Sequence, residues 1–459
     1  MAISDNIYKL LPTWAQNVSV SVFGLYWYWA RFGPGFNKYV QEYKERQDTF
    51  TNNDWNNWQL QRLGKVLEIA SSRVPMYQEI WNESEKKAAS KGILTDLPFL
   101  EKNLVRENSK YLIRNDMNPR WVFTFNTSGT SGTPITTYWT VQELRESHAY
   151  HEVRGANSAG VSFFFPRSTI SGRLVEPNPD SGGPFYRYNL FEHQVYFSAF
   201  HISAKTTPIY LEALRKHHVQ WMTGYAVSHY LLAQHILNQN LTPPPLRAII
   251  TTSEKVTPQM KDVMERAFHC KVYEEYNNVE NTFFANACRC GRLHVSPDVG
   301  VIEILRPDGS PCEPGEVGEV VATCLFRTYQ PLIRYRVGDL AAWDSELCPC
   351  GSPMPVIKEV VGRIEDVVVS PDGRQMVRFH GIFVNQPHVV EGQVIQESLD
   401  LIRVRVVPTE DFNQLDEIDI KKRIEQRLGA SINVVVETVD EIPRTKAGKF
   451  KAVISRVNK

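Results

Sequence analysis

The chain has 459 residues, which is more than one compact core usually holds, so we expect a large domain and a smaller one. Lys plus Arg and Asp plus Glu both number 51, and the resulting net charge of zero argues against a nucleic-acid partner. The hydrophobic fraction of 42% and the charged fraction of 22% are typical of folded globular proteins and argue against a disordered chain.

An apolar and aromatic stretch runs from Val18 to Ala30 near the start of the chain. It is shorter than the roughly 20 residues that cross a bilayer, and no cationic start with a cleavage site precedes it. We therefore expect neither a transmembrane segment nor a secretory signal. A helix that is buried or packed between domains is the expectation, with contact to a membrane surface as the alternative. Seven cysteines without a signal predict reduced thiols and a cytoplasmic location.

Chain order then predicts helices followed by α/β layers. Apolar residues recur at helical spacing from Trp55 to Val74. Between about residues 120 and 330, short β-rich runs alternate with helical patterns, which is typical of α/β layers. The expected strands are Trp121–Phe125, Ile135–Trp139, Val219–Met222, Ala248–Ile250 and Val272–Tyr273, and the expected helices are Tyr210–His217 and Ser228–Leu237. Two further runs, Val299–Leu305 and Gly318–Leu325, flank a Pro-Asp-Gly turn and predict an antiparallel pair.

The pattern changes after Gly362-Arg363 and predicts a separate small α+β domain. We expect the boundary near residue 363, with a large domain over 1–362 and a small one over 363–459. The expected elements are a strand at Asp366–Ser370, a strand at Leu401–Val407, a helix with Ile420, Ile424 and Leu428 on one face and Gly429 after its end, and a strand at Ile432–Val436.

The most distinctive local segment runs from Thr127 to Pro134, Thr-Ser-Gly-Thr-Ser-Gly-Thr-Pro, with five hydroxyls and two glycines. Glycines let backbone N–H groups converge on anionic oxygens, and hydroxyls add side-chain donors, so this loop can hold polyphosphate. By composition alone an ordinary hairpin is an equal alternative, because strands are expected on both sides. The loop is not a Walker sequence, since no Gly-Lys-Ser/Thr ending is present.

This loop resembles the phosphate-binding signature of adenylate-forming ligases, and four further segments resemble signatures of the same family in the same order. They are Tyr276–Glu280, Arg334–Asp339, Gly362–Asp366 and Pro443–Lys449. The branch to which the chain looks most similar is that of phenylacetate–CoA ligases and their capsule-biosynthesis relatives. The resemblance implies a large N-terminal α/β domain and a small, mobile α+β C-terminal domain.

The resemblance also implies the chemistry. A carboxylic acid would react with ATP to give an acyl-adenylate and pyrophosphate, and the acyl group would then pass to coenzyme A. In this scheme the residues Thr127, Ser128, Gly129, Thr130, Ser131, Gly132 and Thr133 hold the β- and γ-phosphates. Glu280 resembles the acid that helps to bind Mg²⁺, which prefers oxygen ligands. Without the flanking motifs, Glu280 would read as a solvated loop residue.

The remaining roles follow the motifs one position at a time. Tyr276 resembles the aromatic residue beside the adenine, Ser253 the small residue next to it, and Asp339 the acceptor of both ribose hydroxyls. Arg363 resembles the arginine that ends the large domain, and Lys449 the mobile lysine that reaches the forming adenylate. Glu365 falls at the hinge, where the small domain would rotate. Two departures stand out, because Asn277 replaces the usual Gly and Glu365-Asp366 replaces the usual Asp-Asp.

A second set of residues predicts a metal site. Cys288, Cys290 and His294 lie close in sequence, and Cys348 and Cys350 follow much later. Any four of these five can complete a zinc tetrahedron, with metal-free thiols as the alternative. The capsule-type relatives carry a similar arrangement, which implies Cys288, His294, Cys348 and Cys350 with Cys290 as the spare. A closed four-ligand site leaves no position for water, so we expect a structural zinc.

The acyl acceptor and the acid stay open at this stage. Gly224 and Tyr225 resemble the family's acyl-pocket segment, and Phe163–Phe165 is a further aromatic candidate. The alternatives to coenzyme A are an amine, which would make the protein an amide ligase, or another acceptor in capsule or natural-product biosynthesis. A non-catalytic zinc-stapled scaffold and a nucleic-acid zinc module are the competing classes. A homodimer is compatible with this reading.

Overall fold

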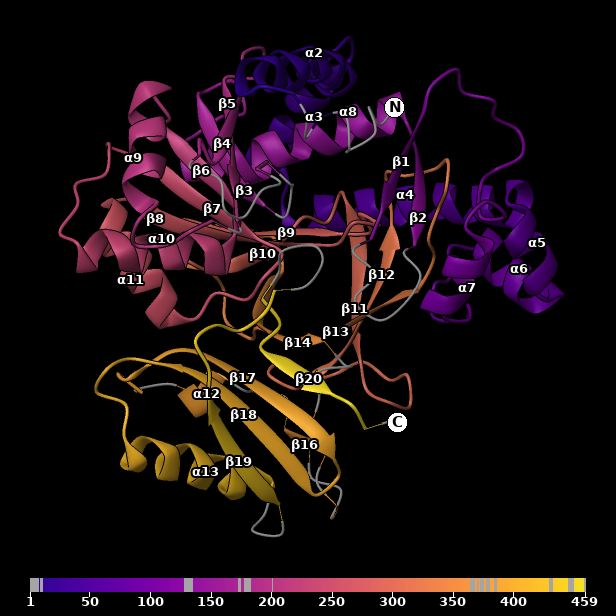
Figure 1. Ribbon diagram of the computed structural model, residues 1–459. Helices are drawn as coiled ribbons and strands as arrows, with labels where there is room; N and C mark the ends of the chain where they lie inside the picture. The colour runs from indigo at the N-terminus through magenta and orange to yellow at the C-terminus, as the bar shows by residue number, and fades with distance from the viewer. Residues whose placement is uncertain are drawn as a thin grey trace.

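The computed structural model describes residues 8, 11–127, 135–171, 175–176, 183–199, 201–363, 368–369, 371, 375–376, 380–383, 386–428, 432–444 and 450–457. A twelve-stranded mixed sheet runs through the part before residue 363, in the order β11-β12-β13-β14-β10-β9-β8-β7-β6-β3-β5-β4 (Figure 1). Its strands are β3 (Arg167–Ser171), β4 (Tyr186–Asn189), β5 (Gln194–Ser198), β6 (Trp221–Tyr225), β7 (Ala248–Thr252), β8 (Lys271–Asn277), β9 (Phe284–Ala287), β10 (Leu293–Val295), β11 (Gly300–Leu305), β12 (Gly318–Cys324), β13 (Tyr335–Trp343) and β14 (Val356–Arg363).

One half of this sheet is the α/β layer that the alternating pattern predicts. Strands β5, β3, β6, β7 and β8 pair in parallel, and helices α9 (Thr207–Lys216), α10 (Ala226–Asn238) and α11 (Pro258–Phe268) gather around them (Figure 1). Parallel strands need helical crossovers, and buried Leu, Ile, Val and Phe side chains fill the space between the layers. The predicted strands and helices of this half are confirmed.

The other half is antiparallel. Strands β11 and β12 pair with Gly300 opposite Cys324 and Leu305 opposite Glu319, which confirms the predicted hairpin around the Pro-Asp-Gly turn. The predicted helix from Trp55 is α4 (Asn52–Arg73), which starts with a capping box between Thr51 and Asp54. Its buried side chains join those of β12 and β13 in the largest core. Helices α3 (Phe36–Thr49), α5 (Pro75–Ile80), α6 (Glu83–Ser90), α7 (Lys102–Asn108) and α8 (Val141–Tyr150) complete this half.

The chain after residue 368 forms a second sheet with its own core. Its order is β19 (Asn433–Thr438), β18 (Leu401–Pro408), β17 (Val389–Ser398) and β20 (Val453–Ser455), and α13 (Gln414–Leu428) packs on it. Ile420, Ile424 and Leu428 are fully buried, as the helical spacing predicts. Strand β20 pairs in parallel with β17 and was not predicted, because three residues are too short for a periodic pattern. Gly429 lies outside the described residues.

The early apolar stretch forms α2 (Thr13–Phe32), and the expectation of a buried helix is wrong for one of its faces. Gln16, Gly24 and Ala30 are buried, but Trp14, Val22 and five other large apolar side chains of the helix are exposed. The helix lies at the edge of the molecule beside β4 and β5 (Figure 1). No helix among the described residues is long and apolar enough to cross a membrane.

Candidate functional site

The phosphate-loop candidate sits between two paired strands. Strands β1 (Val122–Asn126) and β2 (Thr136–Thr140) are antiparallel, and Thr127 closes the hairpin. Its backbone N–H donates to the Ile135 carbonyl at 3.0 Å, and its Oγ1 accepts from the Ile135 N–H at 2.9 Å. Ser128, Gly129, Thr130, Ser131, Gly132 and Thr133 lie outside the described residues. The strands thus hold the two ends of the loop together.

Three residues that are predicted to bind the nucleotide, each from a different motif, meet at the carboxylate of Asp339. Asp339 on β13 accepts a hydrogen bond from the Tyr276 hydroxyl of β8 at 2.9 Å, and Arg363 at the end of β14 pairs with its other oxygen at 2.9 Å. Burial raises the pKa of Asp339, against the opposing effect of the Arg363 guanidinium. Each carboxylate oxygen can accept a second hydrogen bond, so both hydroxyls of a ribose can donate to Asp339 in addition to Tyr276 and Arg363.

Tyr276 is therefore fixed at two points, with its hydroxyl bonded to Asp339 and its ring packed on a neighbouring aromatic side chain. The ring packs on Phe283 with a centroid distance of 4.7 Å, and burial raises the pKa of its phenol well above the usual value. The phenol stays a donor to Asp339 over the ordinary pH range.

Glu280 is buried, with 4% of its surface exposed, and this excludes the solvated-loop alternative. The Tyr335 hydroxyl donates to its Oε1 at 2.6 Å, and the Arg327 guanidinium donates to its backbone carbonyl. Sequence reasoning assigned no role to Tyr335 or Arg327. Tyr335 falls inside the Arg334–Asp339 motif, so its position was a usable signal, whereas Arg327 carried none.

The turn after β7 makes a contact that the sequence did not predict. Ser253 has a φ of +70°, an uncommon left-handed conformation for a residue other than glycine. The next residue, Glu254, accepts from the Val227 N–H at the start of α10 and from the Phe450 N–H of the C-terminal segment, both at 2.9 Å. Lys449 directly precedes Phe450, and both Lys449 and Glu365 lie outside the described residues.

The acyl-pocket candidates lie on β6 and beside it. Gly224 has a φ of +127°, and a Cβ on it would come within 1.9 Å of the Ile170 carbonyl oxygen, so close strand packing requires glycine here. The Tyr225 carbonyl accepts from His229 Nδ1 at 2.7 Å. Phe163 and Phe165 pack in a small core cluster with Trp221. That contact favours ordinary core packing for these two phenylalanines.

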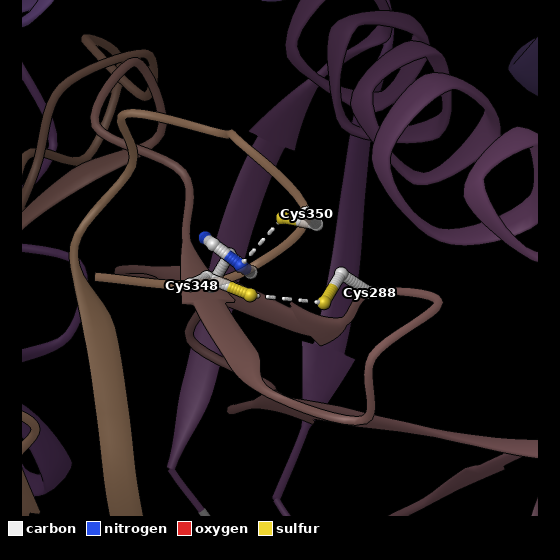
Figure 2. Close-up of side chains that lie close together, drawn as sticks. Cys288, Cys348 and Cys350 are labelled. Atoms are coloured by element: carbon white, nitrogen blue, oxygen red, sulfur yellow. Dashed lines mark hydrogen bonds between the residues drawn. The ribbon is translucent and has the colours of Figure 1, made fainter. Parts of the chain in front are cut away.

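The predicted metal ligands converge from two distant segments. The ligand atoms of Cys288, His294, Cys348 and Cys350 all lie within 4.8 Å of one another. The Sγ atoms of Cys288 and Cys348 are 3.6 Å apart, and Cys350 Sγ is 3.4 Å from His294 Nε2 (Figure 2). Cys290 is exposed and stands outside this cluster, in agreement with its place as the spare cysteine.

The backbone around these side chains suits metal ligation. His294 Nδ1 donates to the Met354 carbonyl at 3.1 Å, which leaves the Nε2 lone pair facing the sulfurs, and burial lowers the pKa of His294 so that it stays neutral. Both cysteine turns end in a left-handed glycine, Gly291 at φ +79° and Gly351 at φ +83°. Burial would raise the pKa of Cys288, but hydrogen bonds from backbone groups and from the Cys348 and Cys350 side chains together lower that pKa.

Three thiolates and one imidazole form a donor set that fits zinc. Tetrahedral Zn–S bonds of about 2.3 Å place two sulfurs about 3.8 Å apart, close to the 3.6 Å between Cys288 and Cys348. The cluster joins the β9–β10 turn to the segment between β13 and β14. A metal here would bind two loops to each other, and four protein ligands would leave no position for a substrate.

The sequence is similar to known proteins over most of its length. A family model described as the CapK C-terminal domain matches residues 368–456. Protein CapK of Staphylococcus aureus is 26% identical over 98% of this chain and 99% of its own length. Phenylacetate-coenzyme A ligase of Thermus thermophilus is 22% identical over 86% of this chain and 95% of its own length.

A solved structure covers nearly the whole fold. The structure of 2-hydroxyisobutyryl-CoA ligase in its postadenylation state superimposes with a TM-score of 0.68 at 19% identity, over 90% of this chain and 91% of that one. This likeness confirms the predicted fold class, a large N-terminal α/β domain with a smaller C-terminal domain.

Proposed function

We propose that this chain, a homologue of CapK and of the phenylacetate–CoA ligases, uses ATP to activate a carboxylic acid as its acyl-adenylate and then transfers the acyl group. The observation that carries the proposal is the meeting of Tyr276, Asp339 and Arg363. Three separate motifs of the sequence converge there on one buried carboxylate. A scaffold protein would have no use for such a charge, because burying a carboxylate costs free energy.

Each residue then has a definite task. Asp339 accepts the ribose hydroxyls, and Tyr276 lies beside the adenine. Arg363 neutralises Asp339 and places its positive charge beside the ribose and the phosphates, while Ser253 lines the adenine side. The hairpin closed by Thr127 presents the loop Ser128–Thr133 to the β- and γ-phosphates, where backbone N–H groups and hydroxyls can donate.

Glu280 is the proposed magnesium ligand. Tyr335 donates to one carboxylate oxygen and fixes the side chain, which leaves the other oxygen for the metal. When bound, Mg²⁺ neutralises phosphate charge as pyrophosphate leaves. Arg327 holds the Glu280 carbonyl and thereby the backbone that carries the ligand.

The contact between Glu254 and Phe450 supports a role for Lys449 in adenylation. Glu254 lies at the carboxyl edge of the parallel strands, and it binds the backbone N–H that directly follows Lys449. Ligands of open α/β sheets bind at this edge. We propose that Lys449 stabilises the charge that develops between the carboxylate and the α-phosphate, and that rotation near Glu365 withdraws it for the second step.

The Cys/His cluster is the proposed structural zinc site. Zinc would hold the β9–β10 turn to the segment before β14, whose far end carries Arg363. Its contribution is therefore to the stability of the sheet that positions the nucleotide residues, and no step of the reaction passes through it.

Coenzyme A is the proposed acceptor, which would make the overall product an acyl-CoA thioester. The support is homology, since three relatives of this chain, from Thermus thermophilus, Pseudomonas putida and Escherichia coli, are phenylacetate-coenzyme A ligases. Transfer to an amine or to another acceptor in capsule or natural-product biosynthesis is the second candidate. The aryl, aliphatic or amino-acid nature of the acid is the question that a substrate screen answers.

The deciding experiment is ATP-dependent pyrophosphate release with a panel of carboxylic acids and Mg²⁺. Hydroxylamine in a parallel series traps each acyl-adenylate as a hydroxamate and so identifies the acid. The best acid is then offered coenzyme A or amines, and the product that forms names the acceptor. Release of no pyrophosphate with any acid would favour the non-catalytic scaffold instead.

A further inference from the structure

The outward face of α2 is a continuous apolar surface. Trp14, Val18, Val22, Leu25 and Trp29 follow one another every three or four residues, which places them on one side of the helix. Their exposed fractions run from 40% to 71%. Folded proteins rarely leave so many large apolar side chains together in water without a binding purpose.

The polarity of α2 is inverted relative to an ordinary surface helix, because its polar side chains point inward to the protein. Asn17 accepts from the Tyr188 N–H of β4 at 2.9 Å, Ser21 Oγ accepts from the Leu190 N–H at 3.1 Å, Gln16 accepts from Arg187 at 2.5 Å, and Arg31 pairs with Glu192 at 3.2 Å. These bonds cover the edge strand β4 and fix the helix. The outward face is therefore a rigid part of the fold, and the sequence has placed apolar residues where a surface in water would be polar.

Neighbouring residues extend this surface at the C-terminal end of α2. The Trp121 ring meets the Trp29 ring edge-on at 6.0 Å, and Trp121 is 45% exposed. The Arg120 guanidinium lies 5.7 Å from the centre of the Trp121 ring. Between Thr13 and Phe32 the sequence has no acidic residue. The margin of the surface thus carries a cation, while the helix brings no negative charge.

We propose that this face, defined as Trp14, Val18, Val22, Leu25, Tyr26, Trp29 and Trp121, docks the protein on the surface of a lipid bilayer. Trp and Tyr side chains favour the boundary between headgroups and acyl chains, since an apolar body carries one polar atom. A cation at the margin complements the lipid phosphates. The helix lies in the plane of the surface and does not cross the membrane.

A second copy of the chain is the competing occupant, and the observations favour lipid. Protein–protein contacts combine an apolar centre with a rim of hydrogen bonds that set orientation. The polar side chains of α2 named above are already bound to the edge strand and its neighbours, so they cannot supply that rim. A single convex helix suits a fluid surface, which needs no shape complementarity. This proposal is independent of the proposed activity.

The test is flotation of the purified full-length protein with vesicles of phosphatidylcholine and phosphatidylglycerol. Wild type should float with the vesicles. The double variant Val18→Glu/Val22→Glu places two charges on the face and should reduce the bound fraction by on the order of tenfold or more. Both positions are more than half exposed, so the fold should persist, and an unchanged Tm verifies this. The matched control is Leu415→Glu on α13, 75% exposed, which should float like wild type.

A second measurement tests whether the face reaches the acyl chains of the bilayer. Lipids brominated on the acyl chains should quench the tryptophan fluorescence of wild type. The variant Trp14→Phe/Trp29→Phe/Trp121→Phe should still float but lose most of that quenching, since the face stays apolar while its three tryptophan fluorophores are removed. Flotation of neither wild type nor the control, or equal flotation of the Val18→Glu/Val22→Glu variant, would overturn the proposal. A wild-type dimer that this variant converts to a monomer would assign the face to a second copy.

Discussion

Strand β14 carries a different polar cluster near each of its ends. At its start, Val356 pairs with His294 of the Cys/His cluster, and at its end Arg363 pairs with Asp339 of the carboxylate cluster. The carboxylate cluster is satisfied within the protein, because Tyr276 and Arg363 supply a donor to each oxygen of Asp339. In the Cys/His cluster, by contrast, three sulfurs and one imidazole nitrogen face one another, and the contacts between them are weak hydrogen bonds to sulfur.

This difference teaches how each cluster is used. The metal-ligating atoms of the Cys/His cluster face one another with only weak hydrogen bonds between them, which supports the proposed cation site and its proposed contribution to stability. The Asp339 carboxylate already has two partners and is held in place before any ligand arrives, which supports its proposed role in binding ribose. Variants at the first end should therefore lower stability, and variants at the second end should lower activity.

The largest effect is expected at the Cys/His end. Cys348→Ser removes a ligand, and zinc-binding free energy in small structural sites is about 10–16 kcal/mol, so even partial loss is large. We expect zinc content to fall from one per chain to near zero and Tm to fall by about 5 °C or more. Metal analysis and thermal unfolding measure both. The matched control is Cys290→Ser, an exposed cysteine outside the cluster. Equal zinc content and equal Tm in the two variants would contradict the proposed metal site.

Lys449→Ala should give the next largest effect, and it should lower activity without lowering stability. Losing one preorganised charge at a transition state costs roughly 10²–10³ in rate, so pyrophosphate exchange should fall by about that factor. Transfer from a supplied acyl-adenylate should largely survive, and zinc content and Tm should not change. Lys446→Ala removes the same charge three residues earlier and should stay active. Loss of both half-reactions to the same extent would argue against alternation of the small domain.

Asp339→Asn tests the carboxylate itself. The substitution keeps the shape of the side chain but removes the negative charge of the carboxylate, which accepts hydrogen bonds from Tyr276, Arg363 and, as proposed, the ribose. We expect the KM for ATP to rise on the order of tenfold, while the KM for the acid changes little, because hydrogen bonds to charged groups contribute about 1.5–3 kcal/mol. Steady-state kinetics with each substrate varied in turn measures this. A change confined to the acid's KM would make the ribose assignment wrong.

The smallest expected effect concerns the Glu254–Phe450 contact. Phe450→Pro removes the N–H that donates to Glu254, and Phe450→Ala keeps it while removing the ring. We expect pyrophosphate exchange to fall about fivefold to tenfold in the proline variant and much less in the alanine variant. Stopped-flow adenylation and thioester formation from supplied acyl-adenylate separate the two half-reactions. A larger loss in the alanine variant would assign the contact to the Phe450 ring instead, which lies under the Arg444 guanidinium.

Local patterns were enough to predict much of the fold. Alternating β-rich and helical runs predicted the parallel half of the sheet, and the spacing of Ile420, Ile424 and Leu428 predicted the buried face of α13. These features depend on contacts between near neighbours in sequence, which periodicity records. The order of the twelve strands and the short β20 depend on pairing between distant segments, and no local pattern records that.

The same division holds for the candidate sites. The sequence predicted which residues carry the proposed chemistry: hydroxyls and glycines for phosphate, Asp339 and Glu280 for ribose and magnesium, and cysteines with His294 for zinc. Only the tertiary structure decided that Cys348 and Cys350 reach His294 and that Tyr276 donates to Asp339.

Tertiary structure also determined which face of α2 is exposed. Its composition did not determine which side would be buried, and β4 decided this, because its edge bonds the polar side of the helix and leaves the apolar side exposed. The physical reason is common to all these cases. Residue type determines which interactions a side chain can make, whereas the pairing of distant strands determines which partners come within the few ångströms over which those interactions act.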